Sequence, residues 1–287
     1  MPGWSPSRMA ERLPRRVRAI ALVHPFPSAV NAVLVFALYL VAGGSLTGAA
    51  ALGVGMLGLQ FAIGAVNDLA DARDDARAKP AKPIPSGLVS RRTATGVALV
   101  GMLVGLGACA VHGPLAFILA LAMLGCGLAY DLGLKGLGLG WLCYAVAFPL
   151  LPLSTWLAAS GTLPPRTELL LPVAALAGPT LQLANGLVDL ERDRLAGVRS
   201  LSLWLGRRDS ILALWALSLA VYGIAWLSLI GSQPPTAALI AVALATVCAG
   251  VGVALSAAER PDLRERGWQL QVVGIALLGG GWLLAVG

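Results

Sequence analysis

The chain has 287 residues, of which 57% are hydrophobic and only 12% are charged, and its formal net charge is +7. Soluble domains carry about a quarter charged residues, so this composition excludes an ordinary soluble protein and indicates a membrane protein. The four cysteines are scattered singly through apolar segments, which argues against a disulfide framework or a zinc site.

The first segment of the chain is basic, with five arginines before residue 19. It lacks the apolar core and cleavage site of a signal peptide. We therefore predict that residues 1–22 form a basic cytoplasmic arm that lies on anionic headgroups, followed by a single transmembrane domain over residues 23–287.

The apolar segments that follow are long enough to cross a membrane as helices, which takes about 20 residues each. They are too long for the alternating strands of an outer-membrane barrel. The sequence predicts nine transmembrane helices, near residues 28–44, 46–66, 93–111, 114–130, 138–159, 169–188, 210–230, 236–257 and 268–286.

The distribution of charge predicts the orientation of these helices. If the N-terminus is cytoplasmic, the arm and the four loops on its side hold 20 of the 21 Lys and Arg residues, and Arg166 is the exception. This pattern follows the positive-inside rule. We therefore expect a multi-pass protein whose N-terminus and charged loops, near residues 67–92, 131–137, 189–209 and 258–267, are cytoplasmic.

Two acidic clusters follow apolar segments on that side. Asp68, Asp71 and Asp75 have the spacing of one helix face, with Asn67 at its edge. Carboxylates grouped in this way repel one another unless a cation lies between them. In the second cluster, the spacing of Asn185, Asp189 and Asp193 also places all three on one helix face.

Oxygen ligands of this kind suit Mg²⁺, which combines one or two carboxylates with phosphate oxygens and water. Two facing clusters can therefore hold magnesium ions that bridge a diphosphate. The basic residues after each cluster can bind the remaining phosphate oxygens. Nucleic acid is not expected as a partner, because the basic residues are interleaved with acids and lack an aromatic platform.

Other charged residues on this side have a simpler interpretation. Asp74 and Glu191 point off the clustered faces, so we expect them to be solvated or paired with a neighbouring arginine. Another group of charged positions is interpreted as marking the ends of helices at the membrane surface: Arg91, Arg92, Arg207, Arg208 and the 258–266 loop.

The first cluster reads N-D-x-x-D-x-x-x-D and is followed by Lys82-Pro83-Ile84-Pro85-Ser86-Gly87. The second reads D-x-x-x-D, with Gly197 and Ser200 after it, and Tyr130 and Lys135 stand between the two. In order and spacing these motifs resemble the UbiA superfamily of intramembrane prenyltransferases. The sequence departs from the family pattern where Lys82 replaces the usual arginine before proline.

The resemblance implies an all-α bundle around a central cavity that opens sideways to lipid. A polyprenyl diphosphate donor would bind with its diphosphate on Mg²⁺ between the motifs, and ionisation would give an allylic carbocation that an acceptor attacks. Aromatic faces can stabilise such a cation, with Trp141, Tyr144, Phe148 and Trp156 as candidates.

The resemblance also implies roles for individual residues. The metal ligands would be Asp68, Asp71, Asp75, Asp189 and Asp193. Tyr130 would orient the diphosphate or contact the cation. The diphosphate would be contacted or framed by Asn67, Arg77, Lys82, Lys135, Asn185 and Arg199. His24 and Asn31 are the candidates for contact with a hydrophobic or amphipathic acceptor.

The acceptor is left open by the residues. An aromatic ring of the 4-hydroxybenzoate or quinone-precursor type is the first expectation. The same donor chemistry would serve an ether-lipid glycerol phosphate, a phosphoribose, a chlorophyllide or haem, or a terpene cyclisation. A CDP-alcohol phosphotransferase is disfavoured because its contiguous Asp motif is absent. A transporter is disfavoured because its ionisable groups would lie near the bilayer midplane.

Overall fold

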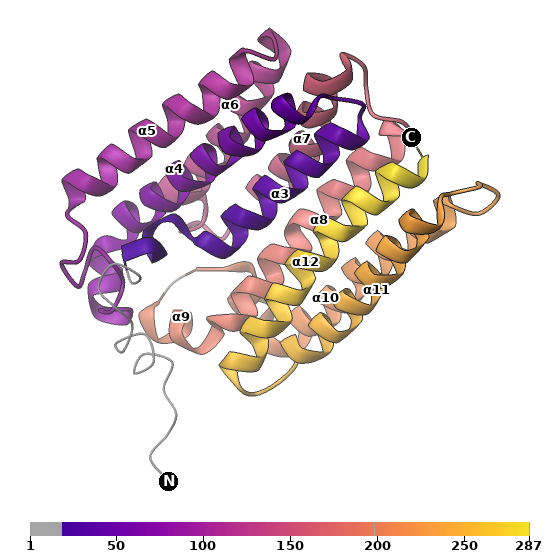
Figure 1. Ribbon diagram of the computed structural model, residues 1–287. Helices are drawn as coiled ribbons and strands as arrows, with labels where there is room; N and C mark the ends of the chain where they lie inside the picture. The colour runs from indigo at the N-terminus through magenta and orange to yellow at the C-terminus, as the bar shows by residue number, and fades with distance from the viewer. Residues whose placement is uncertain (1–18, 198, 287) are drawn as a thin grey trace.

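A computed structural model of the protein describes residues 19–197 and 199–286. Most of the arm predicted over residues 1–22 lies outside this part of the chain. The described residues fold into a bundle of helices, with charged loops at one end and the C-terminal end of the chain at the other (Figure 1).

Each of the nine predicted apolar stretches coincides with one long helix among the described residues. These helices are α3 (Pro25–Val41), α4 (Leu46–Ala78), α5 (Arg91–Ala110), α6 (Pro114–Ala129), α7 (Gly140–Ser160), α8 (Thr167–Val188), α10 (Leu201–Ser228), α11 (Thr236–Ser256) and α12 (Pro261–Val286). Eight are long and apolar enough to span a membrane, α6 when it is taken together with the turn that continues it to Leu134, whereas α3 has 17 residues. An all-helical membrane fold is thus confirmed, and a ninth crossing by α3 stays a prediction.

Three short elements lie at the charged end and were not predicted as separate units. They are the 3-10 helix η1 (Ala21–Val23), the π-helical turn η2 (Tyr130–Leu134) and α9 (Leu190–Ala196). A fourth irregularity is Gly206, whose positive φ of 75° kinks α10 near its start. These elements shape the connections between the long helices at the end that carries the acidic clusters.

Glycines allow two pairs of helices to cross at close range. A Cβ atom at Gly101 of α5 would lie 2.5 Å from the Gly58 carbonyl oxygen of α4. Likewise, a Cβ atom at Gly267 of α12 would lie 2.6 Å from the Gly252 carbonyl oxygen of α11. Small residues at interfaces are characteristic of helices that pack within lipid, where dispersion contacts replace the hydrophobic driving force.

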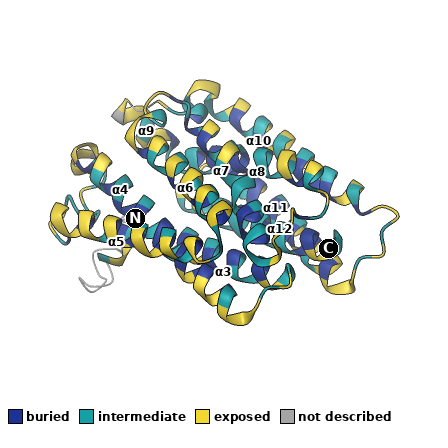
Figure 2. Ribbon diagram, turned by 90° about the horizontal axis from the view of Figure 1, so that it is seen from above, coloured by how far each residue is buried: buried dark blue, intermediate teal, exposed yellow. Residues whose placement is uncertain are grey.

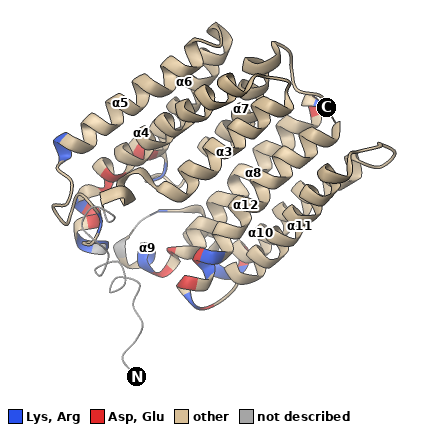
Figure 3. Cartoon of the chain, in the orientation of Figure 1, with Lys and Arg blue, Asp and Glu red and all other residues tan. Residues whose placement is uncertain are grey.

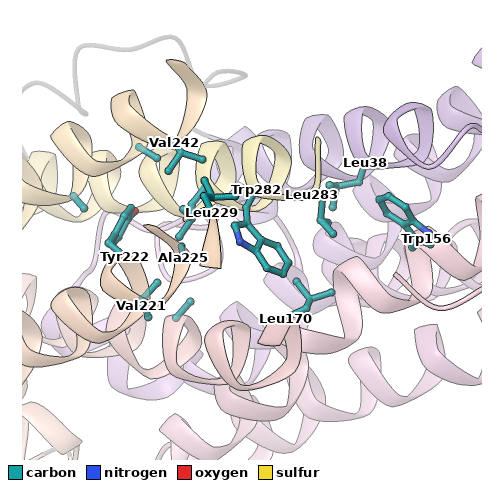
Figure 4. Packing of buried hydrophobic residues seen from close by; sticks show 14 residues of the cluster. Leu38, Trp156, Leu170, Val221, Tyr222, Ala225, Leu229, Val242, Trp282 and Leu283 are labelled. Carbon is teal, nitrogen blue, oxygen red and sulfur yellow. The ribbon is translucent and has the colours of Figure 1, made fainter. Parts of the chain in front are cut away.

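The largest apolar cluster joins helices from both ends of the chain. Leu38 of α3 and Trp156 of α7 pack in one cluster with Leu283 of α12 (Figure 4). Helix α12 also contacts α3 and α8, so the bundle is closed between its first and last helices. Val33 and Leu103 are apolar and exposed, as contact with lipid requires. Exposed residues recur along outer helices such as α5 (Figure 2).

Charged residues gather at one end of the bundle, on the lower ends of α4 and α12 and on α9 (Figure 3). At the opposite end Arg166 and Glu168 are the charged residues of the 161–168 connection and the start of α8. The fold therefore places both acidic clusters at the same end, as the sequence predicted. That this end is cytoplasmic stays a prediction.

Candidate functional site

The first acidic cluster lies on the last turns of α4, which continues without a break through the predicted span and the cluster. Asp68 is 1% exposed and Asp75 is also buried, whereas Asp71 is partly buried. Two buried carboxylates at a helix end require nearby cations, because an unpaired buried charge is strongly destabilising.

Lys82 lies between the two buried carboxylates. Its Nζ donates to Asp68 Oδ1 at 2.9 Å and to Asp75 Oδ2 at 2.6 Å. Burial opposes the charged form of this lysine, but the two carboxylates outweigh that effect and raise the pKa of Lys82. The segment that carries Lys82 is held by Val89, which packs with Ala65 of α4 and Ala94 of α5.

The η2 turn contributes the partners of the remaining residues of the first motif. Lys135, which follows η2, donates to Asp71 Oδ2 at 2.6 Å. Asn67 Nδ2 donates to Asp131 Oδ1 at 2.6 Å, and Lys135 Nζ lies 3.9 Å from the same oxygen. Asp131 is buried, and sequence reasoning gave it no role although it stands next to Tyr130.

The second acidic cluster lies at the junction of α8 and α9. Helix α8 ends at Val188, Asp189 forms the junction, and Asp193 lies on α9. Lys79 Nζ donates to Asp189 Oδ2 at 3.0 Å, and Arg192 also pairs with Asp189. Lys79 belongs to the basic residues after the first cluster, but its pairing with Asp189 was not predicted, since the two lie 110 positions apart along the chain.

The two clusters meet across the gap between α4 and α9, which are in contact. Burial, the neighbouring Asp189 carboxylate and the Asp71 carboxylate together raise the pKa of Asp193 to about 6. Among the ion pairs formed by the described residues, none includes Asp193. The ends of the two motifs therefore form a shared acidic site, in which Lys79, directly after α4, links that helix to the second motif.

His24 lies beside the first motif. Its Nε2 atom is 3.5 Å from Asp68 Oδ1, and this approach depends on Gly64, where a Cβ atom would lie 2.9 Å from His24 Cδ2. His24 itself has a positive φ of 46° at the start of α3. Asn31 lies further along α3 and is partly buried. The structure thus joins His24 to the predicted metal ligands.

Three predicted diphosphate contacts form no ion pair or side-chain hydrogen bond with the motif aspartates within the described part of the chain. Arg77 is exposed and lies about 200° around α4 from Asp75, on the opposite side of the helix. Arg199 is also exposed, and it takes part in none of the ion pairs formed by the described residues. Asn185 is partly buried near the end of α8, one turn before Asp189.

Glu191 is exposed and paired with an arginine, but its partner is distant in sequence, and Arg264 differs from its interpretation. Glu191 was expected to be solvated or paired with a neighbouring arginine, and Arg264 to mark the membrane boundary. Arg264 is instead fully buried and binds both carboxylate oxygens of Glu191, 73 residues away in sequence. The Arg264 guanidinium lowers the pKa of Glu191. A charged loop residue thus has an internal partner that no local pattern reveals.

Aromatic rings continue from the acidic site into the bundle. Tyr130 packs edge-on against Tyr144 with ring centroids 5.5 Å apart, and Tyr144 stacks on Phe148 at 5.9 Å. Lys135 Nζ lies 5.8 Å from the centre of the Tyr130 ring. Gly140 makes room for Tyr130, because a Cβ atom there would lie 2.5 Å from the tyrosine ring.

The donor set of this site suits Mg²⁺ through its chemistry, since every potential ligand in the two motifs is an oxygen atom. The buried Oδ2 atom of Asp68 has no hydrogen-bond partner among the described residues. No group of three or more metal-ligating side chains converges within residues 19–197 and 199–286. The site therefore fits an ion held by one or two carboxylates together with substrate phosphates, rather than one enclosed by protein alone.

The chain is similar to several known proteins. It is 31% identical over 159 residues to a digeranylgeranylglyceryl phosphate synthase of Korarchaeum cryptofilum (strain OPF8), a match that covers 54% of this chain and 56% of that protein. The chain thus matches little more than half the length of that relative.

Solved structures share the fold. An apo UbiA homologue from Aeropyrum pernix K1 has a TM-score of 0.73 and 20% identity, over 88% of this chain and 96% of that one. A UbiA homologue from Archaeoglobus fulgidus, bound to GPP and Mg²⁺, has a TM-score of 0.72 and 15% identity, over 93% and 99% of the two chains. The model of the UbiA prenyltransferase family matches residues 29–279, which is most of the chain. With two aspartate motifs meeting at one end of a helical membrane bundle, this protein belongs to the UbiA prenyltransferase family.

Proposed function

We propose that this protein transfers a prenyl group from a prenyl diphosphate to an acceptor with the help of Mg²⁺. The observation that carries the proposal is the meeting of two aspartate motifs at one end of an apolar bundle, with lysines between them. The homologue from Archaeoglobus fulgidus, whose structure was solved with GPP and Mg²⁺, supports the same donor chemistry.

The proposed residues divide the work at the diphosphate. Asp68, Asp71, Asp75, Asp189 and Asp193 would hold Mg²⁺, which supplies positive charge to the leaving diphosphate. Lys82 and Lys135 are on short segments beside the carboxylates and can turn to phosphate oxygens. Asn67 would keep its orientation through Asp131. Arg77 has no diphosphate contact, because its side chain is exposed on the far side of α4, whereas Arg199 stays a predicted contact.

The reaction begins with cleavage of the allylic C1–O bond, whose electron pair leaves with the diphosphate. The resulting carbocation must be kept from water until the acceptor supplies an electron pair and loses a proton. Tyr130, Tyr144 and Phe148 form a continuous aromatic column from the site into the bundle. Their ring faces can stabilise the cation there.

Two acceptor classes are candidates. An aromatic ring of the quinone-precursor type, the first expectation from the family resemblance, is the first candidate. Similarity to a digeranylgeranylglyceryl phosphate synthase favours a phosphorylated glycerol ether as the second. The acceptors are distinguished by incubating purified protein with Mg²⁺, geranylgeranyl diphosphate and each acceptor in turn, and by identifying adducts by mass spectrometry.

Two substitutions test the donor half of the proposal. Asp71→Asn and Asp193→Asn each remove one carboxylate, and we expect Mg²⁺-dependent diphosphate release to fall at least about 100-fold, as for loss of a ligand that stabilises transition-state charge. Asp74→Asn is the matched control, because Asp74 is an exposed acid on the same turn of α4. Full activity in folded Asp71→Asn and Asp193→Asn proteins would contradict the assignment.

A further inference from the structure

Arg264 is a fully buried arginine near the start of α12, and it has the largest side chain among those with almost no exposure in the described residues. Its Nη1 atom donates to Glu191 Oε1 at 2.9 Å, and its Nη2 atom donates to Oε2 of the same residue. This two-pronged pair joins the start of α12 to α9, the short helix that carries Asp193.

A location at the membrane boundary does not explain why Arg264 is buried. A boundary arginine extends its charged head to water, whereas the exposed fraction of Arg264 is 0%. A positive charge in the first turn of a helix is also unfavourable, because the helix dipole is positive there. Glu191 supplies the compensating charge, so the position of Arg264 is understood only together with α9.

Helix α9 is too short to be stable by itself, with seven residues against the ~12 that an isolated helix needs. Two adjacent residues attach it to the bundle. Leu190 packs in the apolar cluster that contains Leu187 and Leu214, and Glu191 pairs with Arg264.

Glu191 stands midway between the two aspartates of the second motif. Residues two positions apart point to opposite sides of a helix, since they are separated by about 200°. Fixing Glu191 toward α12 therefore turns Asp189 and Asp193 the other way, toward α4, which α9 contacts.

We propose that the Glu191–Arg264 pair positions the second aspartate motif, and that the affinity of the site for Mg²⁺ depends on it. Both are positioning residues, because they act through Asp189 and Asp193 rather than on the substrate. This inference rests on the proposed function for its activity readout and on the structure of α9 for a second, independent readout.

The test removes both charges together. Replacing Glu191 alone would leave the buried Arg264 charge without compensation, whereas removing both charges leaves no buried ion unpaired, since the Glu191 side chain is itself largely exposed. The test variant is therefore the double substitution Glu191→Met with Arg264→Met. The matched control is Arg260→Ala with Asp262→Ala, which removes a local pair of an exposed arginine and a partly buried aspartate at the same end of α12.

Two measurements are made on each protein in the membrane or in detergent. In the test variant we expect the Mg²⁺ concentration for half-maximal diphosphate release to rise about tenfold or more, as for loss of an outer-shell partner of a metal ligand. We expect the maximal rate at saturating Mg²⁺ to stay close to that of the wild type. We also expect faster hydrogen exchange in the peptide over residues 189–197 without metal, and no change in either quantity in the control.

The two proposals fail in different ways. Unchanged half-saturation by Mg²⁺, or unchanged hydrogen exchange in α9, would overturn the positioning role even if the double variant melted at a lower temperature. An inactive wild-type protein would contradict the proposed function instead, and the exchange measurement would still decide whether Arg264 fixes α9.

Discussion

Asp131 is a buried carboxylate that holds two predicted site residues at once. Its Oδ1 atom accepts from Asn67 and lies near Lys135, which itself pairs with Asp71. Sequence reasoning assigned Tyr130 and Lys135 from the same turn and passed over Asp131. The reason is physical, because the partner of Asp131 is 64 residues away and no helical periodicity relates the two positions.

Substitution of Asp131 should weaken the site without removing a ligand. In Asp131→Leu, Asn67 and Lys135 lose their common partner, and we expect the efficiency of diphosphate release to fall about 10- to 100-fold, the range for outer-shell partners of metal sites. The measurement is the rate at varied donor and Mg²⁺ concentrations. Asp209→Asn, at an exposed acid of α10, is the control. Wild-type kinetics in Asp131→Leu would show that Asn67 keeps its position unaided.

At the scale of the elements, hydropathy predicted where every long helix of the described chain lies. A long apolar stretch in lipid must form a helix, because only a helix satisfies its backbone hydrogen bonds within the segment. Hydropathy predicted the connections less well. Helix α9 separates from α8 at Asp189, where no proline or glycine stands, and the next two residues, Leu190 and Glu191, make tertiary contacts that no local pattern reveals. The motif spacing predicted the shared face of Asp68 and Asp75, but not that Lys82 would lie between them.

The crossing of α4 and α5 gives a prediction at this scale. In Gly101→Ala the new methyl group would collide with the Gly58 carbonyl, and we expect a loss of about 1–3 kcal/mol in the free energy of unfolding, as for overpacked cores. Gly107→Ala on the same helix meets no atom within 4 Å and should be neutral or slightly stabilising. Thermal melts of both variants in the same detergent make the comparison. Equal melting temperatures would mean that the two helices separate readily.

At the scale of the whole molecule, the distribution of charge predicts which end faces the cytoplasm. All the charged motifs gather at one end, whereas the 161–166 connection lies at the other (Figure 3). The positive-inside rule assigns the charged end to the cytoplasm. The fold is the same whichever end faces the cytoplasm, so the predicted orientation needs its own experiment.

Cysteine accessibility tests this orientation. Ser86 and Thr162 are both exposed and stand at opposite ends of the bundle. With Cys126 and Cys248 replaced by alanine to lower the background, we expect Thr162→Cys to react with a membrane-impermeant maleimide in intact cells. Ser86→Cys should react only after permeabilisation. The opposite pattern would place the acidic site outside the cytoplasm.

The lysines that pair with the motif carboxylates have a consequence for the order in which ligands bind. An ion that arrives alone competes with Lys82 for Asp68 and Asp75 and with Lys135 for Asp71. An ion that arrives with a diphosphate gives the displaced ammonium groups new anionic partners. Linkage requires that each ligand then raises the affinity of the other by the same factor. We therefore expect Mg²⁺ and the prenyl diphosphate to bind cooperatively, so that each binds only weakly in the absence of the other.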